Sequence, residues 1–206
     1  MKIEKFVLSS METNCYFLIN EETTEMVIVD PAVCQNYLIS HVKTNGYVPK
    51  AILLTPAHFD HVMGIDEWVK EFDIPVYLHE EEAELLANPA LNLSNMFGVE
   101  YAYRDVNVLK DGEEIVLAGL RLQVIHTPGH TKGGCFYYVA SEGVLISGDT
   151  LFYRSVGRSD FPTGNMETLT QSIREKLFCL PDEVVVYPGH DRPTCIADEK
   201  VENLFV

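Results

Sequence analysis

The heptapeptide Thr55-Pro56-Ala57-His58-Phe59-Asp60-His61 follows directly on the apolar run Ala51–Leu54, and no other part of the sequence says more about the architecture. Two of its imidazoles flank a carboxylate, and polar groups of this kind are expensive to bury without partners. Residues that follow a buried strand lie on a loop that a rigid scaffold holds in place. The heptapeptide therefore predicts a strand whose end carries polar side chains into a site at the edge of a sheet.

Three further segments repeat this arrangement of an apolar run followed by a short polar turn. They are Arg121–Ile125 before His126-Thr127-Pro128-Gly129-His130, Val144–Ser147 before Gly148-Asp149-Thr150, and Val184–Val186 before Tyr187-Pro188-Gly189-His190. Pro-Gly pairs favour tight turns, which direct the next residue away from the strand. If these strand ends lie side by side, the following side chains converge: His58, Asp60, His61, His130, Asp149 and His190.

Each of these residues also has an ordinary structural explanation when it is taken alone. A single histidine after a Pro-Gly turn, such as His130 or His190, is more often a loop residue than a ligand, and an aspartate such as Asp149 often serves as a turn or cap residue. The joint pattern is what favours a metal site. The other histidines lie in a predicted helix, before an acidic helix and at a strand end, and we predict structural roles for them: His41, His79 and His126.

The ligand types indicate which metals fit. Imidazole and carboxylate without thiolate suit zinc, iron, nickel or manganese rather than calcium, and zinc is the default for a hydrolytic site of this composition. Cys135 and Cys179 lie inside a predicted strand and a predicted helix. We therefore expect both to be buried, small apolar side chains rather than ligands.

The composition favours one packed domain that spans residues 1–206, without a linker or repeat. The formal net charge is −16, from 31 acidic and 15 basic residues, and such a surface repels phosphate backbones and anionic lipid. No apolar run approaches the roughly 18 residues of a membrane span, and Met1–Ser10 lacks the apolar core of a signal peptide. The five cysteines show no pair spacing. We expect a cytoplasmic protein without nucleic-acid or membrane partners.

Many strand-like runs and a few amphipathic helices indicate two sheets with helices packed outside them. The expected strands are Lys2–Leu8, Cys15–Ile19, Met26–Val29, Ala51–Leu54, Val76–Leu78, Glu114–Leu117, Arg121–Ile125, Cys135–Val139, Val144–Ile146 and Val184–Val186. The expected helices are Val33–Asn45, stopped by Gly46, and the apolar-periodic stretches 65–72 and 169–177. The segment Asn88–Arg104 has no period, and its aromatic residues either wall a cleft or cover a sheet edge, the second role being the commoner one.

Together the motifs resemble the metallo-β-lactamase superfamily, and within it the single-domain type of the glyoxalase II-like (hydroxyacylglutathione hydrolase-like) branch. The family patterns T-H-x-H-x-D-H, H-T-P-G-H-T, S-G-D and P-G-H correspond here to Thr55–His61, His126–Thr131, Ser147–Asp149 and Pro188–His190. The segment Val156–Asn165 is also similar to the one that follows this aspartate in the glyoxalase II branch. The similarity extends over almost the whole chain.

This resemblance implies an α+β fold, the αββα four-layer sandwich, and two metal positions. One position takes His58, His130 and Asp149, and the other takes Asp60, His61, His190 and the bridging Asp149. The implied activity is metal-dependent hydrolysis of a small thioester, in which metal-bound hydroxide attacks the carbonyl and the catalytic residues Asp60 and Asp149 orient it. An anionic thioester is the expected substrate, with Arg154, Arg158, Lys132 and Arg192 as candidate contacts unless they form surface ion pairs.

The main departure from the family is Pro56, which stands where the first motif histidine belongs. The first position therefore keeps only two imidazoles and the shared carboxylate, so we expect one tightly bound zinc and a weakened second site. Iron remains possible by ligand type, although persulfide dioxygenases of this superfamily use the missing histidine for their iron. Two smaller departures are Asp191, in place of a common glycine, and Lys132, in place of a common proline. Asp191 is either an acceptor for a ligand histidine or a solvated turn residue.

Other functions remain open on the same site. A lactonase or another ester hydrolase would use the same chemistry, and Pro56 supports a catalytically impaired metal-binding protein. β-Lactamases are exported and nucleic-acid processing relatives carry basic surfaces, so both are less favoured. The chain ends soon after His190, without the helical C-terminal region that holds glutathione in longer glyoxalase II enzymes.

Overall fold

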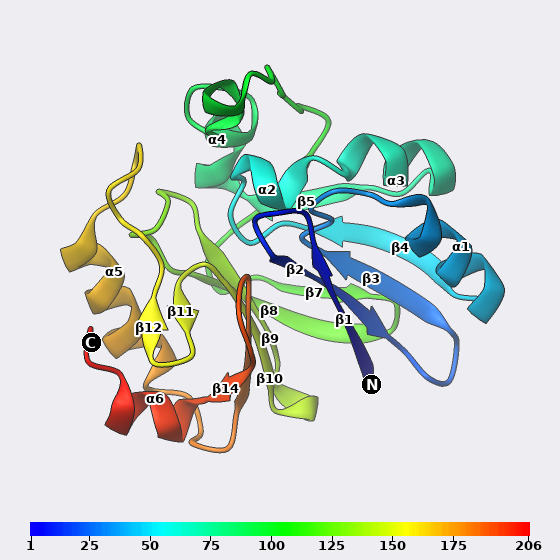
Figure 1. Ribbon diagram of the computed structural model, residues 1–206. Coiled ribbons are helices and arrows are strands. Elements are labelled where there is room, and N and C mark those ends of the chain that lie inside the picture. Colours follow the sequence, from blue (N-terminus) through cyan, green and yellow to red (C-terminus); the bar gives the residue numbers. More distant parts are fainter.

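Two six-stranded sheets form the centre of the computed structural model, which describes residues 1–206 (Figure 1). The first sheet contains, in spatial order, β1 (Lys2–Leu8), β2 (Thr13–Ile19), β3 (Glu25–Val29), β4 (Val48–Leu53), β5 (Val76–His79) and β6 (Asn107–Leu109). The second contains β14 (Thr194–Cys195), β13 (Val185–Pro188), β10 (Val144–Gly148), β9 (Cys135–Val139), β8 (Leu120–His126) and β7 (Glu114–Leu117). A separate two-stranded ribbon pairs β11 (Leu151–Phe152) with β12 (Ser155–Val156).

Helices cover the outer face of each sheet (Figure 1). The first sheet carries α1 (Asn36–Asn45) and α3 (Ile65–Phe72), and the second carries α5 (Met166–Ser172), its π-helical continuation η4 (Ile173–Leu177) and α6 (Ile196–Glu202). Short helical segments lie in the connections: α2 (Phe59–Val62), α4 (Ala83–Leu86), η1 (Glu80–Glu82), η2 (Ser94–Phe97) and η3 (Ala140–Glu142). None of the helices has the length and apolar character needed to span a bilayer.

Three apolar layers separate these four layers of secondary structure. Side chains alternate between the two faces of a strand, so each sheet contributes to two layers. In β2, Phe17 packs outward with Leu38 and Trp68 of the first helices, whereas Tyr16 faces the second sheet and Tyr137. The outer layer of the second sheet contains Phe136 of β9 with side chains of α5, η4 and α6. The αββα four-layer sandwich expected from the sequence is confirmed.

The strand directions bring four loops to one end of the sandwich. In the second sheet β10 is parallel to β13, and both β8 and β10 are antiparallel to β9, so β8, β10 and β13 run the same way. Their carboxyl ends therefore lie at the same edge. The end of β4 joins them from the first sheet, because Thr55 O accepts a hydrogen bond of 3.3 Å from Cys135 N at the start of β9.

The sequence predicts the long periodic elements and misses the short ones. Three expected strands and the helix 65–72 have their observed bounds, and Gly46, with φ of 67°, ends α1 as expected. Helix α1 begins at Asn36 rather than Val33. The acidic helix expected after His79 is present as η1 and α4. The elements without a predicted counterpart are two to seven residues long: β6, β11, β12, β14, α2, η2, η3 and α6. Their length is too short for a period to be recognised.

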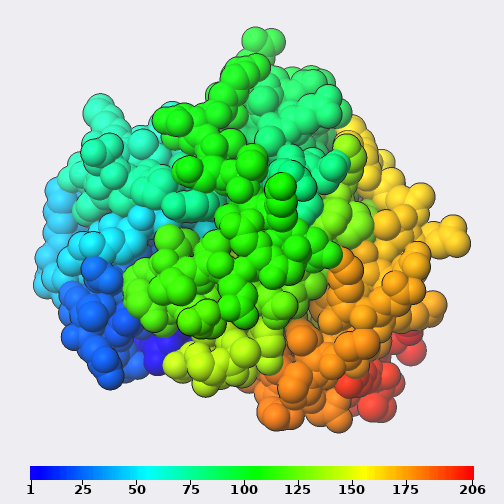
Figure 2. Space-filling model, turned by 180° about the vertical axis from the view of Figure 1, so that it is seen from behind, coloured from blue at the N-terminus to red at the C-terminus, as the bar shows by residue number.

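The aperiodic segment Asn88–Arg104 combines the two roles that its aromatic residues allowed. Tyr101 and Tyr103 pack against the outer core of the first sheet, while Met96 and Phe97 on η2 are exposed. The chain then crosses from β6 to β7 and so from the first sheet to the second. This green connection runs over the middle of the back face, between the blue-to-cyan N-terminal part and the orange C-terminal part (Figure 2).

The cysteines are unpaired, and one expectation about them is wrong. Cys135 is buried in β9 as predicted. Cys179 is exposed, because the last helical turn ends at Leu177 and the chain turns outward after it. Its Sγ lies 3.0 Å from the carbonyl of Glu175, which satisfies the last turn of the helix rather than the core.

A buried carboxylate connects the loop after β4 with the loop after β8. Glu82, the last residue of η1, accepts hydrogen bonds from Ala57 N at 2.8 Å, Gly133 N at 2.8 Å and Thr131 Oγ1 at 3.0 Å. The contact is close, since a Cβ on Gly133 would lie 2.2 Å from Glu82 N. Burial raises the pKa of the Glu82 carboxyl to about 7, although its three donors favour the charged form.

This raised pKa predicts how stability depends on pH. An unfolded glutamate titrates near about 4.3, so below that pH the group carries no penalty for folding. Between that pH and about 7, Glu82 is ionised in the unfolded chain but still protonated in the folded protein. The free energy of unfolding therefore falls as pH rises through this range. We expect Glu82→Gln to gain on the order of 3 kcal/mol relative to the unaltered protein across this range, on top of a constant loss of hydrogen bonding. Urea unfolding of both proteins at several pH values checks this, and parallel curves would contradict it.

Candidate metal centre

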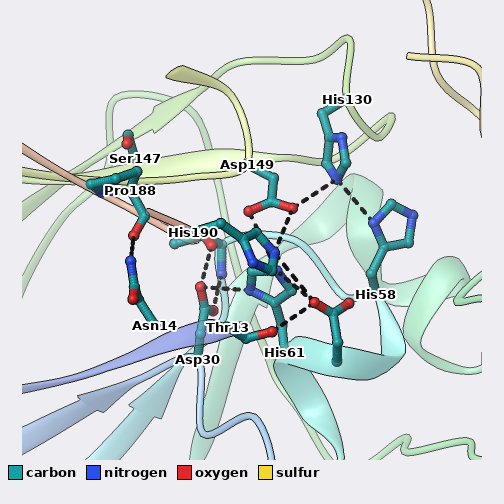
Figure 3. Close-up of polar contacts among 12 residues, drawn as sticks. Thr13, Asn14, Asp30, His58, His61, His130, Ser147, Asp149, Pro188 and His190 are labelled. Carbon is teal, nitrogen blue, oxygen red and sulfur yellow. Dashed lines mark hydrogen bonds and ion pairs between the residues drawn. The ribbon is translucent and has the colours of Figure 1, made fainter. Parts of the chain in front are cut away.

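The structure brings all six candidate ligand residues together at the shared end of the sandwich (Figure 3). His58 is the residue before α2, and Asp60 and His61 lie on this helix. The other three occupy the loops that follow β8, β10 and β13: His130, Asp149 and His190. His41, His79 and His126 lie elsewhere, as predicted. The rings of His79 and His126 stack with their centroids 3.9 Å apart. The Nε2 atom of His41 lies 2.7 Å from Oε2 of Glu4.

Four of these side chains surround one point. The Oδ2 atom of Asp60 lies 3.3 Å from Nε2 of His190 and 3.6 Å from Nε2 of His61. Asp149 faces both rings, with Oδ1 at 3.4 Å from His61 Nε2 and Oδ2 at 3.4 Å from His190 Nε2. Ligands at 2.0–2.1 Å from a tetrahedral zinc ion lie roughly 3.3–3.4 Å from one another. The four contacts are close to this length. Asp60, His61 and His190 each place a donor atom within 4.8 Å of the other two, and Asp149 adds one oxygen toward each ring.

Two atoms of this cluster are buried without any hydrogen-bond partner. They are Nε2 of His61 and Oδ1 of Asp149, which face each other across the gap. Buried polar atoms in proteins are nearly always paired, so two orphans in contact require a compensating group. A divalent cation between them would satisfy both. The residues present thus fit a metal ion at this position.

A second position next to the first has fewer donors. His58 Nδ1 lies 2.9 Å from His130 Nε2, which in turn lies 3.6 Å from Asp149 Oδ2. Asp149 therefore stands between the two positions. The neighbouring position 56 contributes no donor, because proline has no polar side chain and no N–H. This half of the centre has two nitrogens and one shared carboxylate.

Hydrogen bonds on the far side of the rings fix which nitrogen faces the centre. The Nδ1 atom of His61 donates to Oδ2 of Asp30 at 3.0 Å, and that carboxylate also accepts from Thr55 N at 2.8 Å and Thr55 Oγ1 at 2.5 Å. The Nδ1 atom of His130 donates to the carbonyl of Arg158 at 2.6 Å. In both rings Nε2 therefore faces the centre, and it presents a lone pair there when the ring is neutral.

The first residues of β2 hold the ligands from the other sheet. Thr13 Oγ1 donates to Asp60 Oδ2 at 2.8 Å. Asn14 Nδ2 donates to the carbonyls of Pro188 and Asp191 at 2.8 and 2.9 Å, on either side of His190. Asp191 itself is exposed and acts through its backbone, with φ of 65° in the left-handed region that favours glycine. Of its two expected roles, the turn residue is the one observed.

The sequence analysis missed four residues that support the centre: Thr13, Asn14, Asp30 and Glu82. Asp30 carried a usable signal, because it follows the apolar run Met26–Val29 as Asp149 follows its own strand. Thr13 and Asn14 precede a strand rather than follow one. Glu82 stands in a run of acidic residues, Glu80–Glu82, and only its burial separates it from its exposed neighbour Glu81.

Opposite charges within the cluster lie close enough to shift the pKa values of its histidines. Burial alone would keep His61 neutral, but Asp149, Asp60 and Asp30 outweigh it and raise its pKa well above the ordinary value. Burial also opposes charge on His190, whose pKa Asp149 and Asp60 raise to about 10. In contrast, burial and the neighbouring His130 lower the pKa of His58 to about 3. A metal ion must therefore displace protons from His61 and His190, while His58 is already neutral.

A cavity of about 410 Å³ opens onto the centre. Asp60, Asp149 and His190 form its polar side, and most of the remaining wall is apolar, with Leu93, Phe152 and Phe161 among the lining residues. A larger hollow of about 550 Å³ lies at the edge of the sandwich near the N-terminus, where it is lined mainly by polar and acidic residues such as Glu21, Glu114 and Glu142. It contains none of the six candidate ligands.

The sequence matches one described family over most of its length and known proteins over the whole of it. The family described as the metallo-beta-lactamase superfamily matches residues 11–190. A probable metallo-hydrolase, YqgX of Bacillus subtilis (strain 168), is 39% identical over the whole of this chain and 98% of its own length. The hydroxyacylglutathione hydrolase GloC of Haemophilus influenzae is 31% identical, again over the whole chain and 98% of its own length.

Solved structures agree with the sequence relatives. The crystal structure of the BLEG-1 B3 metallo-beta-lactamase superimposes with a TM-score of 0.94 at 38% identity, covering 99% of both chains. The structure of TTHA1623 in a di-iron-bound form gives a TM-score of 0.88 at 34% identity, covering 98% of this chain and 100% of the other. With the four-layer sandwich and the convergent loops, these matches establish that the chain belongs to the metallo-β-lactamase superfamily.

Proposed function

We propose that the protein is a metal-dependent hydrolase of small thioesters. The observation that carries this proposal is the cluster of donor atoms from Asp60, His61 and His190, with Asp149 facing both rings and two of the buried donor atoms lacking a hydrogen-bond partner. These four residues would hold one metal ion tightly, and His58 and His130 would hold a second one weakly, with Asp149 shared. Zinc is the metal we propose, and the di-iron form of TTHA1623 shows that a 34% identical protein takes iron.

The residues of the chain prepare the attack of water on a carbonyl. A metal ion held there supplies Lewis acidity, which lowers the pKa of water and polarises the carbonyl. Thr13 fixes the carboxylate of Asp60, and Asp60 and Asp149 accept hydrogen bonds from the attacking water and so orient it. The water oxygen bonds to the carbonyl carbon and gives up a proton to the surrounding water. The oxyanion then collapses, the C–S bond breaks, and a thiolate leaves with the electron pair of that bond. Because a thiol has a pKa near about 8.5, this leaving group needs less help from a general acid than an amine would.

The thioester class is supported by the relative named hydroxyacylglutathione hydrolase. An anionic thioester has less support from the geometry, because the four candidate cations have partners already. Arg158 makes two hydrogen bonds to Asp160 at 2.9 and 2.7 Å, and Lys132 pairs with Glu81. Arg154 pairs with Glu202, and Arg192 lies over the ring of Tyr153 at 3.7 Å. Of the four, only Arg158 lines the cavity.

A second candidate function is hydrolysis of β-lactams, favoured by one observation, the 0.94 TM-score with a structure described as a B3 metallo-beta-lactamase. Lactone or ester hydrolysis would use the same attack of water on a carbonyl. A metal-binding protein without catalysis is the reading that Pro56 allows. The experiments below separate these four.

Metal content tests the unequal halves of the centre. We expect the purified protein to retain about one zinc ion per chain after dialysis against a weak chelator, because one position has four donors and the other only three. Pro56→His restores an imidazole and should raise the content toward two, whereas Pro56→Ser removes the ring without adding a strong ligand. Elemental analysis of the three proteins gives the answer. If the Pro56→His and Pro56→Ser proteins contain equal amounts of zinc, residue 56 does not limit binding of the second metal ion.

Loss of a proposed ligand should abolish turnover. We expect Asp60→Asn and His190→Ala to lower kcat/KM for lactoyl and acetyl thioesters by more than the roughly 10–100-fold that follows loss of a partner of a ligand. His41→Ala, which changes a histidine on α1 far from the centre, is the control and keeps its rate. Assays of a lactone and of a chromogenic cephalosporin run beside them. A faster lactone or cephalosporin reaction than thioester reaction contradicts the substrate class, and absence of all three contradicts an enzyme.

The hydrogen bond from His61 to Asp30 should matter for metal affinity. Asp30→Asn keeps the shape of the side chain but loses the charge that orients the imidazole, so we expect zinc to bind about 10–100-fold more weakly. Competition with a chelating dye measures this. The matched control is Asp73→Asn, since Asp73 is at the end of α3, away from the centre. Equal affinities in the two variants would show that Asp30 serves the fold alone.

A further inference from the structure

Two apolar cavities adjoin each other beside the centre. The first is the cavity of about 410 Å³ described above. The second measures about 200 Å³ and is bordered by Val33, Met63 and Val99. Both share part of their wall, namely Met11, Phe59, Asp60 and Phe97. The two cavities therefore lie side by side at these four residues. Together they are here termed the apolar groove, which begins at the candidate ligands and extends to Val33, Met63 and Val99.

The groove gathers apolar side chains that the fold leaves uncovered. Met96 and Phe97 are 69% and 57% exposed, although both are large and apolar. Met11, Val33 and Val99, from three other segments of the chain, are also exposed along the apolar groove. Scattered exposed apolar residues are normal, but a contiguous patch beside a reactive centre marks a binding surface.

A stacked aromatic pair connects this surface to the candidate ligands. The rings of Phe59 and Phe97 lie 4.2 Å apart with an interplanar angle of 27°, and both rings line both cavities. Phe59 lies on α2 directly before Asp60, so the wall of the groove and a ligand belong to the same helix. A bound molecule that packs on these two rings would therefore have one end next to the carboxylate of Asp60.

The groove offers little charge to attract an ionic occupant. Arg158 is the only lysine or arginine that lines either cavity, and Asp160 holds it while its guanidinium lies 4.1 Å from the ring of Phe161. Neither cavity has a lysine or arginine without a carboxylate partner to meet a carboxylate or phosphate on the substrate chain. The net charge of −16 also repels an anion. An uncharged, extended apolar group is the occupant that the walls fit.

We propose that the apolar groove binds the acyl chain of a thioester substrate, with the carbonyl at the centre and the chain running over Phe59 and Phe97 toward Val99. This proposal rests on the proposed function, because it takes the thioester carbonyl as the group that meets the centre. It assigns selectivity to the acyl side: the protein prefers medium and long unbranched acyl groups over short polar ones such as lactoyl.

Binding of inert analogues tests the groove independently of turnover. The probes are ketones in which a methylene replaces the sulfur of butanoyl, octanoyl and decanoyl thioesters of N-acetylcysteamine, titrated calorimetrically into the metal-loaded protein. Full burial gives about fourfold in affinity per methylene, and a half-open groove should give roughly twofold. We therefore expect affinity to rise by more than tenfold from butanoyl to octanoyl. Equal affinity for all three chain lengths overturns the proposal.

A matched pair of variants locates the effect. Val99→Asp places a charge in the distal cavity and should weaken decanoyl binding at least tenfold more than butanoyl binding. Val108→Asp, at an equally exposed valine on β6 outside the groove, should keep the full dependence on chain length. If Val99→Asp also keeps the full dependence of affinity on acyl length, the acyl chain does not lie in the distal cavity. If sedimentation shows a dimer that Val99→Asp dissociates, the patch is an interface between copies, which also overturns the proposal.

Turnover assays on the matching thioesters separate this proposal from the function on which it rests. A protein that binds the ketones with the expected dependence but hydrolyses no thioester keeps the groove and loses the proposed function. If the protein hydrolyses thioesters at rates independent of acyl length and binds the three ketones equally, the proposed function stands and the acyl-binding groove is contradicted. Replacing N-acetylcysteamine by a larger thiol at constant acyl length shows whether the thiol side contributes; a larger gain there than along the acyl series contradicts selectivity for the acyl chain.

Discussion

The buried carboxylate of Asp149 is the constraint around which the rest of this structure is arranged. It is enclosed by His61, His130 and His190 and is only 9% exposed, so little solvent is available to stabilise its charge. The backbone approaches so closely that side chains are excluded: a Cβ on Gly189 would lie 2.1 Å from Asp149 Oδ1, and one on Gly157 would lie 1.7 Å from the Asp149 carbonyl oxygen. The Pro-Gly turn before His190 is therefore needed for its lack of a side chain as much as for its bend.

The sandwich meets this constraint by directing strand ends rather than by forming a loop of its own. Because β8, β10 and β13 run in one direction, three of the ligand loops leave the second sheet at the same edge. The end of β4 packs against the end of β10, where a Cβ on Gly148 would lie 2.1 Å from Thr55 Oγ1. Residues that support the ligands come from strands as well: Thr13 and Asn14 from β2, and Asp30 from the end of β3. The two sheets thus share the cost of placing charged groups in the interior.

The sequence was sufficient for the architecture and for the six residues that converge, because both depend on local patterns. Apolar runs followed by His and Asp are visible without coordinates, and the superfamily resemblance orders them. Glu82 shows what local pattern cannot supply: its donors, Ala57, Thr131 and Gly133, belong to loops 25 to 51 positions away. The apolar groove is hidden for the same reason, since Met11, Val33 and Phe97 meet only after folding. The exposure of Cys179 depended on where a helix ended, which periodicity fixes poorly.

Pro56 removes one donor but leaves the supports of its half of the centre in place. Glu82 still ties the residue before His58 to the loop after His130, and the Arg158 carbonyl still orients the His130 ring. Both imidazoles remain buried and neutral, at a cost that a fold without use for them would avoid by exposing or replacing them. The metal position of His58, His130 and Asp149 therefore lacks one imidazole at residue 56 but keeps its other ligands and the residues that orient them. His58 and His130 both line the cavity, and the His58 ring lies against that of Phe161, so the pair forms part of the cavity wall beside the cluster of Asp60, His61 and His190.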